Sequence, residues 1–337
     1  MGHHFESDLA REHPHVDLTD LFCFPSGPSM TAFVICVNPA SVPSDVTNLS
    51  EDALLAFHLS FDRELRTGLT MTFRRDDDMV VVGRLDEPVP ELGDPGRQVG
   101  AVRFGATAGL PGGGRVFAGT ARDPFSGNAI GLRAFRAAAA EGIHAPESFD
   151  NAENFFVDLV TTAIVFELPN DELAEQIHYH GTSAWFEDGH WHRANRIGHV
   201  LFPHLYSPSP AATIEMMTSP ITHDAVMVDA VAAHIAGYAA RAGHVADPVG
   251  YGEAVARRLL PDMVPYRPGT PADYAVDGPN GRRIDDLAMD VALHWLVGGP
   301  TPSRVGRSEH AQAEFPFLVG HGRHHGRAQG KEPRSDG

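Results

Sequence analysis

Residues 20–39 read DLFCFPSGPSMTAFVICVNP, and this stretch indicates how the chain begins to fold. Its two apolar runs, 20–26 and 30–39, are rich in Phe, Val and Ile, and each ends at or near Pro or Asn. Short apolar runs that end in this way are typical of β-strands. The sequence therefore predicts that the chain starts as a β-rich structure.

Strand-like segments continue outward from this stretch to about residue 207. They cover residues 54–62, 68–75, 80–85, 98–109, 114–125, 155–169 and 177–202. One alanine-rich helix interrupts them at residues 129–142, where Gly142 closes it. The Asp76–Asp78 run lies between two of these strands, so a solvated hairpin turn is favoured over a diphosphate-binding cluster.

The composition changes after about residue 208, where the apolar residues take helical spacing. Helices are expected within residues 221–243, 249–264 and 282–299, each ending near Gly or Pro. Strands followed by helices indicate an α+β fold, mainly antiparallel β and sandwich-like or barrel-like, with a helical C-terminal part.

Three parts of the chain are expected from this pattern. Residues 1–207 form the β-rich part, and residues 208–300 form a helical part packed on it as one continuous domain. Residues 301–337 form an irregular C-terminal segment. Its polar tail, rich in Gly, Arg and His, is expected to be disordered from about residue 322.

The charge balance limits the partners that are expected. The chain has 337 residues, with 26 Lys and Arg against 44 Asp and Glu, which gives a net charge of −18. Nucleic acid and anionic membrane surfaces would repel such a chain, so neither is an expected partner. No apolar run has the length of a membrane span and no signal peptide is visible, which predicts a cytoplasmic protein. The sequence gives no indication of the oligomeric state.

The two cysteines and the absence of several sequence motifs limit the classes of catalysis that are expected. Cys23 and Cys36 lie in strand-like runs and are expected to be buried free thiols, with a disulfide between paired strands as the alternative. The sequence contains no nucleotide-cofactor motif, no serine-nucleophile elbow, no zinc helix and no Cys-x-x-Cys pair. Nicotinamide chemistry, serine hydrolysis and thiol catalysis are therefore disfavoured.

Several segments resemble, in the same order, the family labelled domain of unknown function 4331. They are residues 2–24, 59–74, 116–125, 160–169, 191–202, 278–293 and 313–322. Many members of that family are exported, whereas no leader is visible here, so this chain is expected to resemble an intracellular member without a signal peptide. The family's turn near Asp62 is rich in Asp, and most of its acidic residues are absent here. The label itself implies no activity.

The first candidate site is the N-terminal stretch, where His and carboxylate side chains are dense. Its members that match the family opening are His4, Glu6, Asp17 and Asp20. Such side chains suit zinc, iron or manganese, and carboxylates with carbonyl oxygens suit calcium. Turn chemistry is the alternative, in which Asp17 caps a turn and Asp20 begins a strand.

The second candidate site is the segment IHYHGTSAWFEDGHWH, residues 177–192. His178 and His180 are two residues apart, so on a strand they point to one face, and His190 and His192 repeat the spacing. Four imidazoles on one face of a hairpin could hold a metal ion. A solvent-facing row of histidines is the alternative.

Two further groups carry charge next to apolar runs. Arg196 and His199 are the candidate catalytic residues, because an Arg beside a His can orient a carboxylate or phosphate. Arg196 can equally pair with a structural Asp. Asn280, Arg282, Arg283 and Asp286 form a turn-and-helix-start segment that is either structural, as an ion-pair network, or anion-binding.

These groups support two hypotheses. The first is a metal-dependent enzyme that acts on a small molecule in specialised metabolism, with a divalent ion that activates water or oxygen. The identity of the ion (Fe, Zn, Mn or Ca) and the type of reaction are left open. The second is a non-catalytic binding or scaffold protein in which a structural cation ties down the N-terminus.

Overall fold

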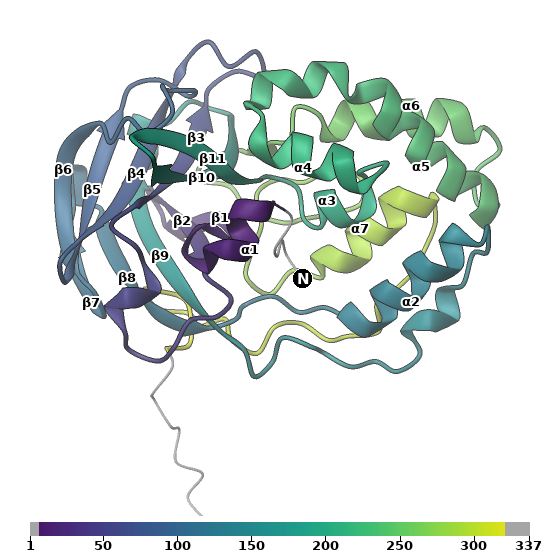
Figure 1. Ribbon diagram of the computed structural model, residues 1–337, viewed down its shortest axis with the longest axis horizontal. Helices are drawn as coiled ribbons and strands as arrows, with labels where there is room; N and C mark the ends of the chain where they lie inside the picture. Colours follow the sequence, from purple (N-terminus) through teal and green to yellow (C-terminus); the bar gives the residue numbers. More distant parts are fainter. Residues whose placement is uncertain (1–6, 321–337) are drawn as a thin grey trace, which may run out of the picture.

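The computed structural model of the protein describes residues 7–320. Two antiparallel sheets pack face to face on one side of the molecule, and the longer helices lie on the other (Figure 1). The first sheet, in spatial order, consists of β1 (Leu18–Gly27), β2 (Met30–Val37), β9 (Val160–Pro169), β8 (Arg115–Arg122) and β7 (Ala106–Gly109). The predicted fold class, α+β and mainly antiparallel β, is confirmed.

The second sheet is longer and carries a short additional strand. Its order is β11 (His190–Ile197), β10 (Ile177–Glu187), β3 (Ala53–Ser60), β4 (Gly68–Asp76), β5 (Met79–Leu85) and β6 (Arg97–Arg103), and β12 (Val264–Tyr266) pairs with β10. β6 continues through a tight turn into β7, and β1 contacts β10 and β11. The sandwich is therefore closed along both of its sides, which gives it a barrel-like character.

The helices follow the described chain in this order. They are α1 (Asp8–Glu12), α2 (Ala129–Ala140), α3 (Phe202–Leu205), α4 (Pro210–Thr218), α5 (Val228–Ala242), α6 (Pro248–Leu259) and α7 (Ala288–Val297), with a 3-10 helix η6 (Ile221–Val226) between α4 and α5. Within residues 7–320, no helix is long and apolar enough to cross a membrane.

The opening strands form the hairpin β1–β2, with Cys23 opposite Phe33. β2 lies between β1 and β9, and nearly all of its residues are buried. Because both of its faces are covered, β2 is a continuous apolar run instead of an alternating one. Cys23 and Cys36 are buried free thiols, as expected, and the register places Cys36 opposite Asp20.

An aromatic cluster joins the two sheets at the centre of the sandwich. Phe33 of the first sheet packs edge-on against Phe57 of the second, with ring centroids 5.3 Å apart. Phe166 of β9 stacks on Phe33 at 5.0 Å and meets Phe57 edge-on at 5.5 Å. Such offset and edge-to-face pairs add to the stabilisation from burial alone. The same apolar core continues without interruption into the helices, through residues such as Trp295.

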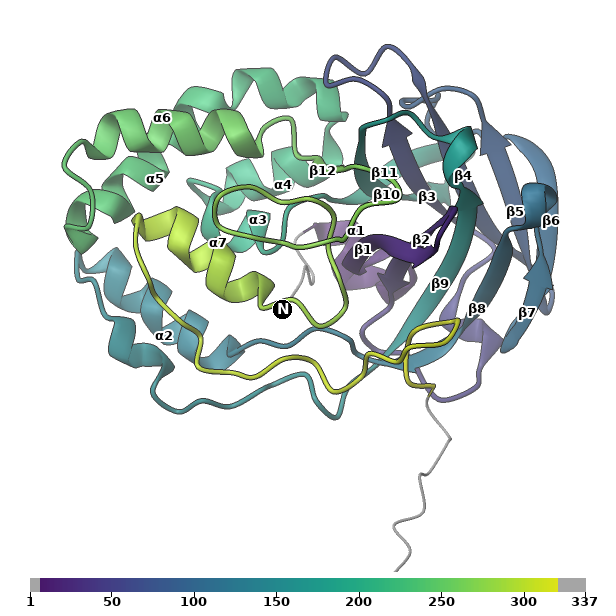
Figure 2. The ribbon, with the colours of Figure 1, turned by 180° about the vertical axis from the view of Figure 1, so that it is seen from behind.

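The helical side includes a segment of the part expected to be β-rich. α2 lies beside α5, where Phe135 stacks on Tyr238 with ring centroids 6.1 Å apart. Figure 2 shows α2 below α7 on the helical side, far along the chain from the other helices. The helical part therefore combines α2 with the helices that follow residue 200.

Two predicted boundaries need correction. The strand expected from residue 155 begins at Val160. The helix expected from Arg282 begins at Ala288. Polar groups of residues 282–286 form hydrogen bonds that are not part of a helix. Arg282 forms an isolated bridge with Cys23, and the Asp286 carboxylate accepts the backbone N–H groups of Arg283 and Tyr274. α1, α4 and β12 were not expected.

The segment after α7 runs back along the molecule to the first sheet (Figure 2). It has no regular secondary structure over residues 299–307, in agreement with the irregular segment expected there. It then reaches β8, where the backbone N–H of Arg122 donates to the carbonyl of Val319 at 2.9 Å. The tail that was expected to be disordered lies outside the described residues.

Candidate functional site

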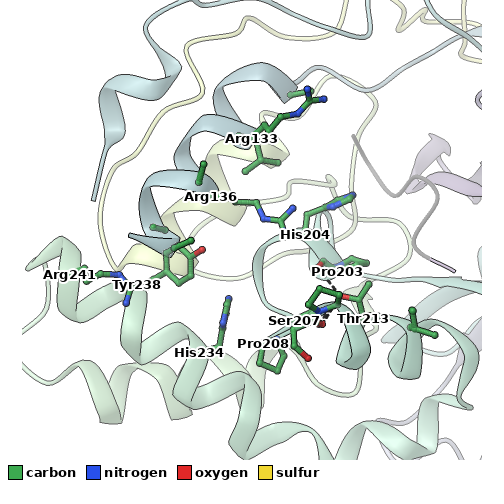
Figure 3. Close-up of a pocket in the computed structure, with 18 of the residues that line it drawn as sticks. Arg133, Arg136, Pro203, His204, Ser207, Pro208, Thr213, His234, Tyr238 and Arg241 are labelled. Carbon is green, nitrogen blue, oxygen red and sulfur yellow. Dashed lines mark hydrogen bonds between the residues drawn. The ribbon is translucent and has the colours of Figure 1, made fainter. Parts of the chain in front are cut away.

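A pocket of about 740 Å³ opens between the helices, away from the β-sandwich. Helices α2, α3, α4 and α5 enclose it, and Arg11 of α1 lies at its edge. Its volume falls in the range of about 300–1,000 Å³ that is typical of small-molecule sites. Figure 3 shows the side chains that line it.

The helical repeat places the functional side chains of the pocket in rows. On α2, Arg133 and Arg136 are three residues apart and so lie on the same face. On α5, His234, Tyr238 and Arg241 follow at spacings of four and three, which again gives one face. The start of α2 is fixed by the Asn128 side chain, which accepts the backbone N–H of Gly131 at 2.8 Å.

The pocket is basic although the chain carries a net charge of −18. Its lining includes six side chains that carry or can acquire positive charge: Arg11, Arg133, Arg136, Arg241, His204 and His234. Among the described residues that line it, none is Asp or Glu. Within residues 7–320, neither Arg133 nor Arg136 forms an ion pair or a hydrogen bond. Arg11 pairs with Asp8 at 2.9 Å, and the Arg241 guanidinium lies 4.8 Å from the centre of the Tyr238 ring.

Two side chains of α5 add hydrogen-bonding groups to the pocket. His234 Nε2 lies 3.0 Å from the carbonyl of Leu205, so this nitrogen carries the proton and Nδ1 is an acceptor in the neutral ring. Burial lowers the pKa of His234, and the positive charges of Arg241 and Arg136 lower it further. Burial raises the pKa of Tyr238, so its hydroxyl stays protonated and can donate.

The side chains come from opposite walls of the pocket, and Arg133 extends upward in the view, away from Arg136 and His234 (Figure 3). In Figure 3, Arg136 extends from α2 toward His204 of α3, and His234 rises from α5 below them. Arg241 lies against Tyr238 at the other end of the pocket (Figure 3). The pocket therefore has positive charge at one end, and at the other end an aromatic ring with a cation against it. Such a pocket can bind an elongated ligand that carries an anionic group.

The predicted catalytic residues, Arg196 and His199, lie outside this pocket in a buried polar network. Arg196 pairs with Asp224 of η6 at 2.6 Å, and Asp224 also accepts the backbone N–H of Asp262 at 2.8 Å. Asp262 in turn accepts the backbone N–H of His199 at 2.6 Å. The His199 ring then lies 3.0 Å from the Tyr274 hydroxyl.

This network connects β11 to the helices, and its charged members are fully covered. The side chains of Arg196 and Asp224 are 0% and 1% exposed. Arg196 therefore forms the ion pair with an Asp that the sequence offered as the alternative, and its catalytic role stays a prediction.

Asp262 is expected to make the stability of the protein depend on pH. Burial raises the pKa of this carboxyl to about 7, and the charge of Arg196 opposes the shift only in part. A carboxyl whose pKa is raised in the folded state stabilises the fold fully when the pH is below its ordinary pKa. This stabilisation is lost as the pH rises through the folded-state pKa of about 7. We expect the free energy of unfolding of the wild type, relative to Asp262→Asn, to fall between pH 5 and pH 8. Urea denaturation of both proteins at the two pH values measures this, and a constant difference would contradict it.

The N-terminal carboxylates have protein partners. Asp17 accepts the side-chain amide of Asn195 at 3.1 Å. Asp20 pairs with Arg282 at 2.7 Å, and both side chains are at most 5% exposed. The guanidinium of Arg282 also lies 4.2 Å from the centre of the Phe22 ring. His4 and Glu6, the other members of this predicted site, lie outside the described residues.

The four histidines of the β10–β11 hairpin do not gather on one face, which corrects the second predicted site. The register places His190 opposite Glu187 and His192 opposite Trp185, at the turn end of the hairpin. His178 and His180 lie near the other end of β10, opposite residues of β3. His180 stacks on His58 of β3 with ring centroids 4.4 Å apart. The hairpin is therefore too long for the two histidine pairs to meet.

The residues from 280 onward hold a turn together. The Asn280 amide donates to the Thr270 hydroxyl at 2.9 Å and to the carbonyl of Pro271 at 2.7 Å. Arg283 pairs with Asp285 at 2.9 Å on the surface. Together with the buried Asp20–Arg282 pair, these contacts fit the structural interpretation of this segment.

The described residues offer no assembled metal site. In residues 7–320, no group of three or more His, Cys, Asp or Glu side chains is placed to hold a metal ion. Asp17, Asp20, His178 and His180 have separate surroundings. The divalent ion expected from the sequence stays a prediction.

The residues of the basic pocket were not predicted from the sequence. The paired arginines of the alanine-rich helix 129–140 were a usable signal, because they stand on one helical face in a chain that is otherwise acidic. His234, Tyr238 and Arg241 also share a face. What the sequence did not reveal is that these two helices, about a hundred residues apart, face each other.

Comparison with family models, with curated proteins and with solved structures finds no match for this chain. The resemblance to the family of unknown function therefore stays a prediction based on the motifs quoted above.

Proposed function

We propose that the protein binds a small organic anion in the basic pocket between α2 and α5. The observation that carries this proposal is the concentration of arginines on a pocket whose described lining has no acidic residue. Arg133 and Arg136 have no protein partner among the described residues, so their donors are free for a ligand. Arginine suits this role because its planar group binds carboxylate or phosphate through two parallel hydrogen bonds.

The remainder of the lining indicates what the anion is attached to. Leu132, Pro203 and Ile214 contribute apolar surface, together with several alanines of α2. The favoured ligand is therefore an amphipathic molecule with one carboxylate or phosphate group and an apolar body.

This proposal concerns binding and leaves catalysis open. It is closest to the binding-protein hypothesis drawn from the sequence. The metal-dependent enzyme remains an untested hypothesis, and no ligand group among the described residues favours it. His234 Nδ1 and the Tyr238 hydroxyl could serve as an acceptor and a donor toward a bound ligand.

A matched ligand panel tests the proposal. Aromatic and aliphatic carboxylates and phosphate monoesters are compared with their neutral amides and alcohols by calorimetric titration. We expect binding of anionic members only, and a loss of affinity of about tenfold or more in the double variant R133Q/R136Q, equivalent to about 1.4 kcal/mol.

The control for this variant is R74Q/R97Q, which removes two exposed arginines of the second sheet and changes the net charge equally. This control should keep wild-type affinity, because it alters the long-range field but not the pocket. Equal binding of charged and neutral members, no binding by any member, or equal losses in both double variants would overturn the proposal.

A further inference from the structure

A second, much smaller cavity lies on the outer face of the second sheet. Its volume is about 30 Å³, and its base is formed by His58, His180, Thr182 and Arg193. Residues 89–94 cover it. The loop that contains them is tied to β4, where the hydroxyls of Thr70 and Thr72 donate to the carbonyls of Glu87 and Pro95 at 2.8 and 2.6 Å.

Arg193 brings a positive charge to this cavity, and among the described residues it is not part of an ion pair. Its side chain is partly buried, and burial together with the charge of Arg196 lowers its pKa to about 10. It therefore remains charged at neutral pH. Within residues 7–320, Arg193 forms no ion pair or hydrogen bond, although Glu91 and Asp94 also line the cavity. Arg196 has Asp224 as its partner. A charge withdrawn from water without a partner is unfavourable.

A buried ring nitrogen of His180 is a second, independent observation in favour of a bound species in the cavity. The residue is 2% exposed, and its Nδ1 is buried without a hydrogen-bond partner among the described residues. The neighbouring His58 differs, since its two ring nitrogens lie 2.9 Å from the Thr70 hydroxyl and 2.8 Å from the Thr182 hydroxyl. Buried polar atoms are nearly always satisfied by protein or by a bound species.

We propose that the cavity binds one small monovalent anion of halide size, held by the Arg193 guanidinium and by N–H at His180 Nδ1. The volume admits one or two species the size of water, so phosphate and larger organic anions are excluded. A halide accepts several hydrogen bonds and compensates the charge of Arg193. This site is separate from the pocket of the proposed function and does not depend on it.

Two measurements on the full chain test this inference. The first compares the melting temperature in sodium chloride and in sodium gluconate at equal ionic strength, because a species that binds only the folded state raises it. We expect chloride to raise the melting temperature by about 2 °C or more in the wild type. The rise should vanish in R193Q and persist in the matched surface variant R74Q.

The second measurement is anomalous scattering from wild-type crystals grown in sodium bromide. We expect a bromide peak between Arg193 and His180, and this readout needs no variant to fold. R133Q/R136Q should keep the chloride response, which separates this site from the pocket. The proposal is overturned by water alone in the cavity, by equal melting in the two salts, or by an unchanged response in R193Q.

Discussion

Replacing Asp224 by Ala is expected to lower the free energy of unfolding by about 3–5 kcal/mol, the usual penalty for removing one partner of a buried ion pair. The change leaves the Arg196 guanidinium fully buried without the carboxylate that lies 2.6 Å from it. Arginine cannot lose its proton to relieve the penalty. The backbone N–H of Asp262 also loses its acceptor.

Urea denaturation of wild type and variant at neutral pH measures this effect. Glu253→Ala is the matched control, because it removes the carboxylate of the exposed Arg257–Glu253 pair. Exposed pairs contribute only about 0–1 kcal/mol, so this control should be nearly silent. A loss in Asp224→Ala no larger than the loss in Glu253→Ala would show that the network does not stabilise the fold.

Replacing Arg282 by Ala is expected to cost a similar amount at pH 8, about 3–5 kcal/mol, and less at pH 5. Arg282 is the partner of Asp20 and also donates to the carbonyl of Leu21 at 3.1 Å. Burial already raises the pKa of Asp20, and Arg282 opposes that shift. Without Arg282 the pKa of Asp20 rises further, so the Asp20 carboxyl of the folded variant holds its proton more strongly. The free energy of unfolding of the variant therefore falls further below that of the wild type as the pH increases.

The comparison between two pH values separates this prediction from that for Asp224. Asp224→Ala leaves the Arg196 guanidinium without its partner, and arginine cannot lose its proton. Arg282→Ala leaves the Asp20 carboxyl, which can accept a proton. Arg283→Ala is the control, since its partner Asp285 lies at the surface. If the loss in Arg282→Ala equalled that of the control, or were larger at pH 5 than at pH 8, the account of this pair would be wrong.

The fold class could be predicted because it depends on local patterns. The apolar runs of β1 and β2 and the helical spacing of α5 and α6 are contained in the sequence near each element. The start of α7 could not be predicted in this way. It is set by contacts of residues 282–286 with β1 and with the backbone of Tyr274, which are distant in the sequence or lie outside the helix.

The candidate site was harder to predict for the same physical reason. Charged and polar residues with conspicuous spacing, such as Arg196, His199 and Asp20, are placed in buried pairs with Asp224 of η6 and with the non-helical residues Asp262 and Arg282. The side chains of the pocket are less conspicuous, because each helix contributes only part of the positive charge. Their combination depends on α2 and α5 lying on opposite sides of one pocket, which no local pattern reveals.

The crystal structure of the complex with the tightest-binding member of the anion panel tests the central claim most directly. The account predicts that the carboxylate or phosphate group lies within hydrogen-bonding distance of Arg133 or Arg136, with the apolar body between α2 and α5. A ligand bound elsewhere on the protein, or one whose anionic group faces solvent while the arginines remain without contact to it, would contradict the account.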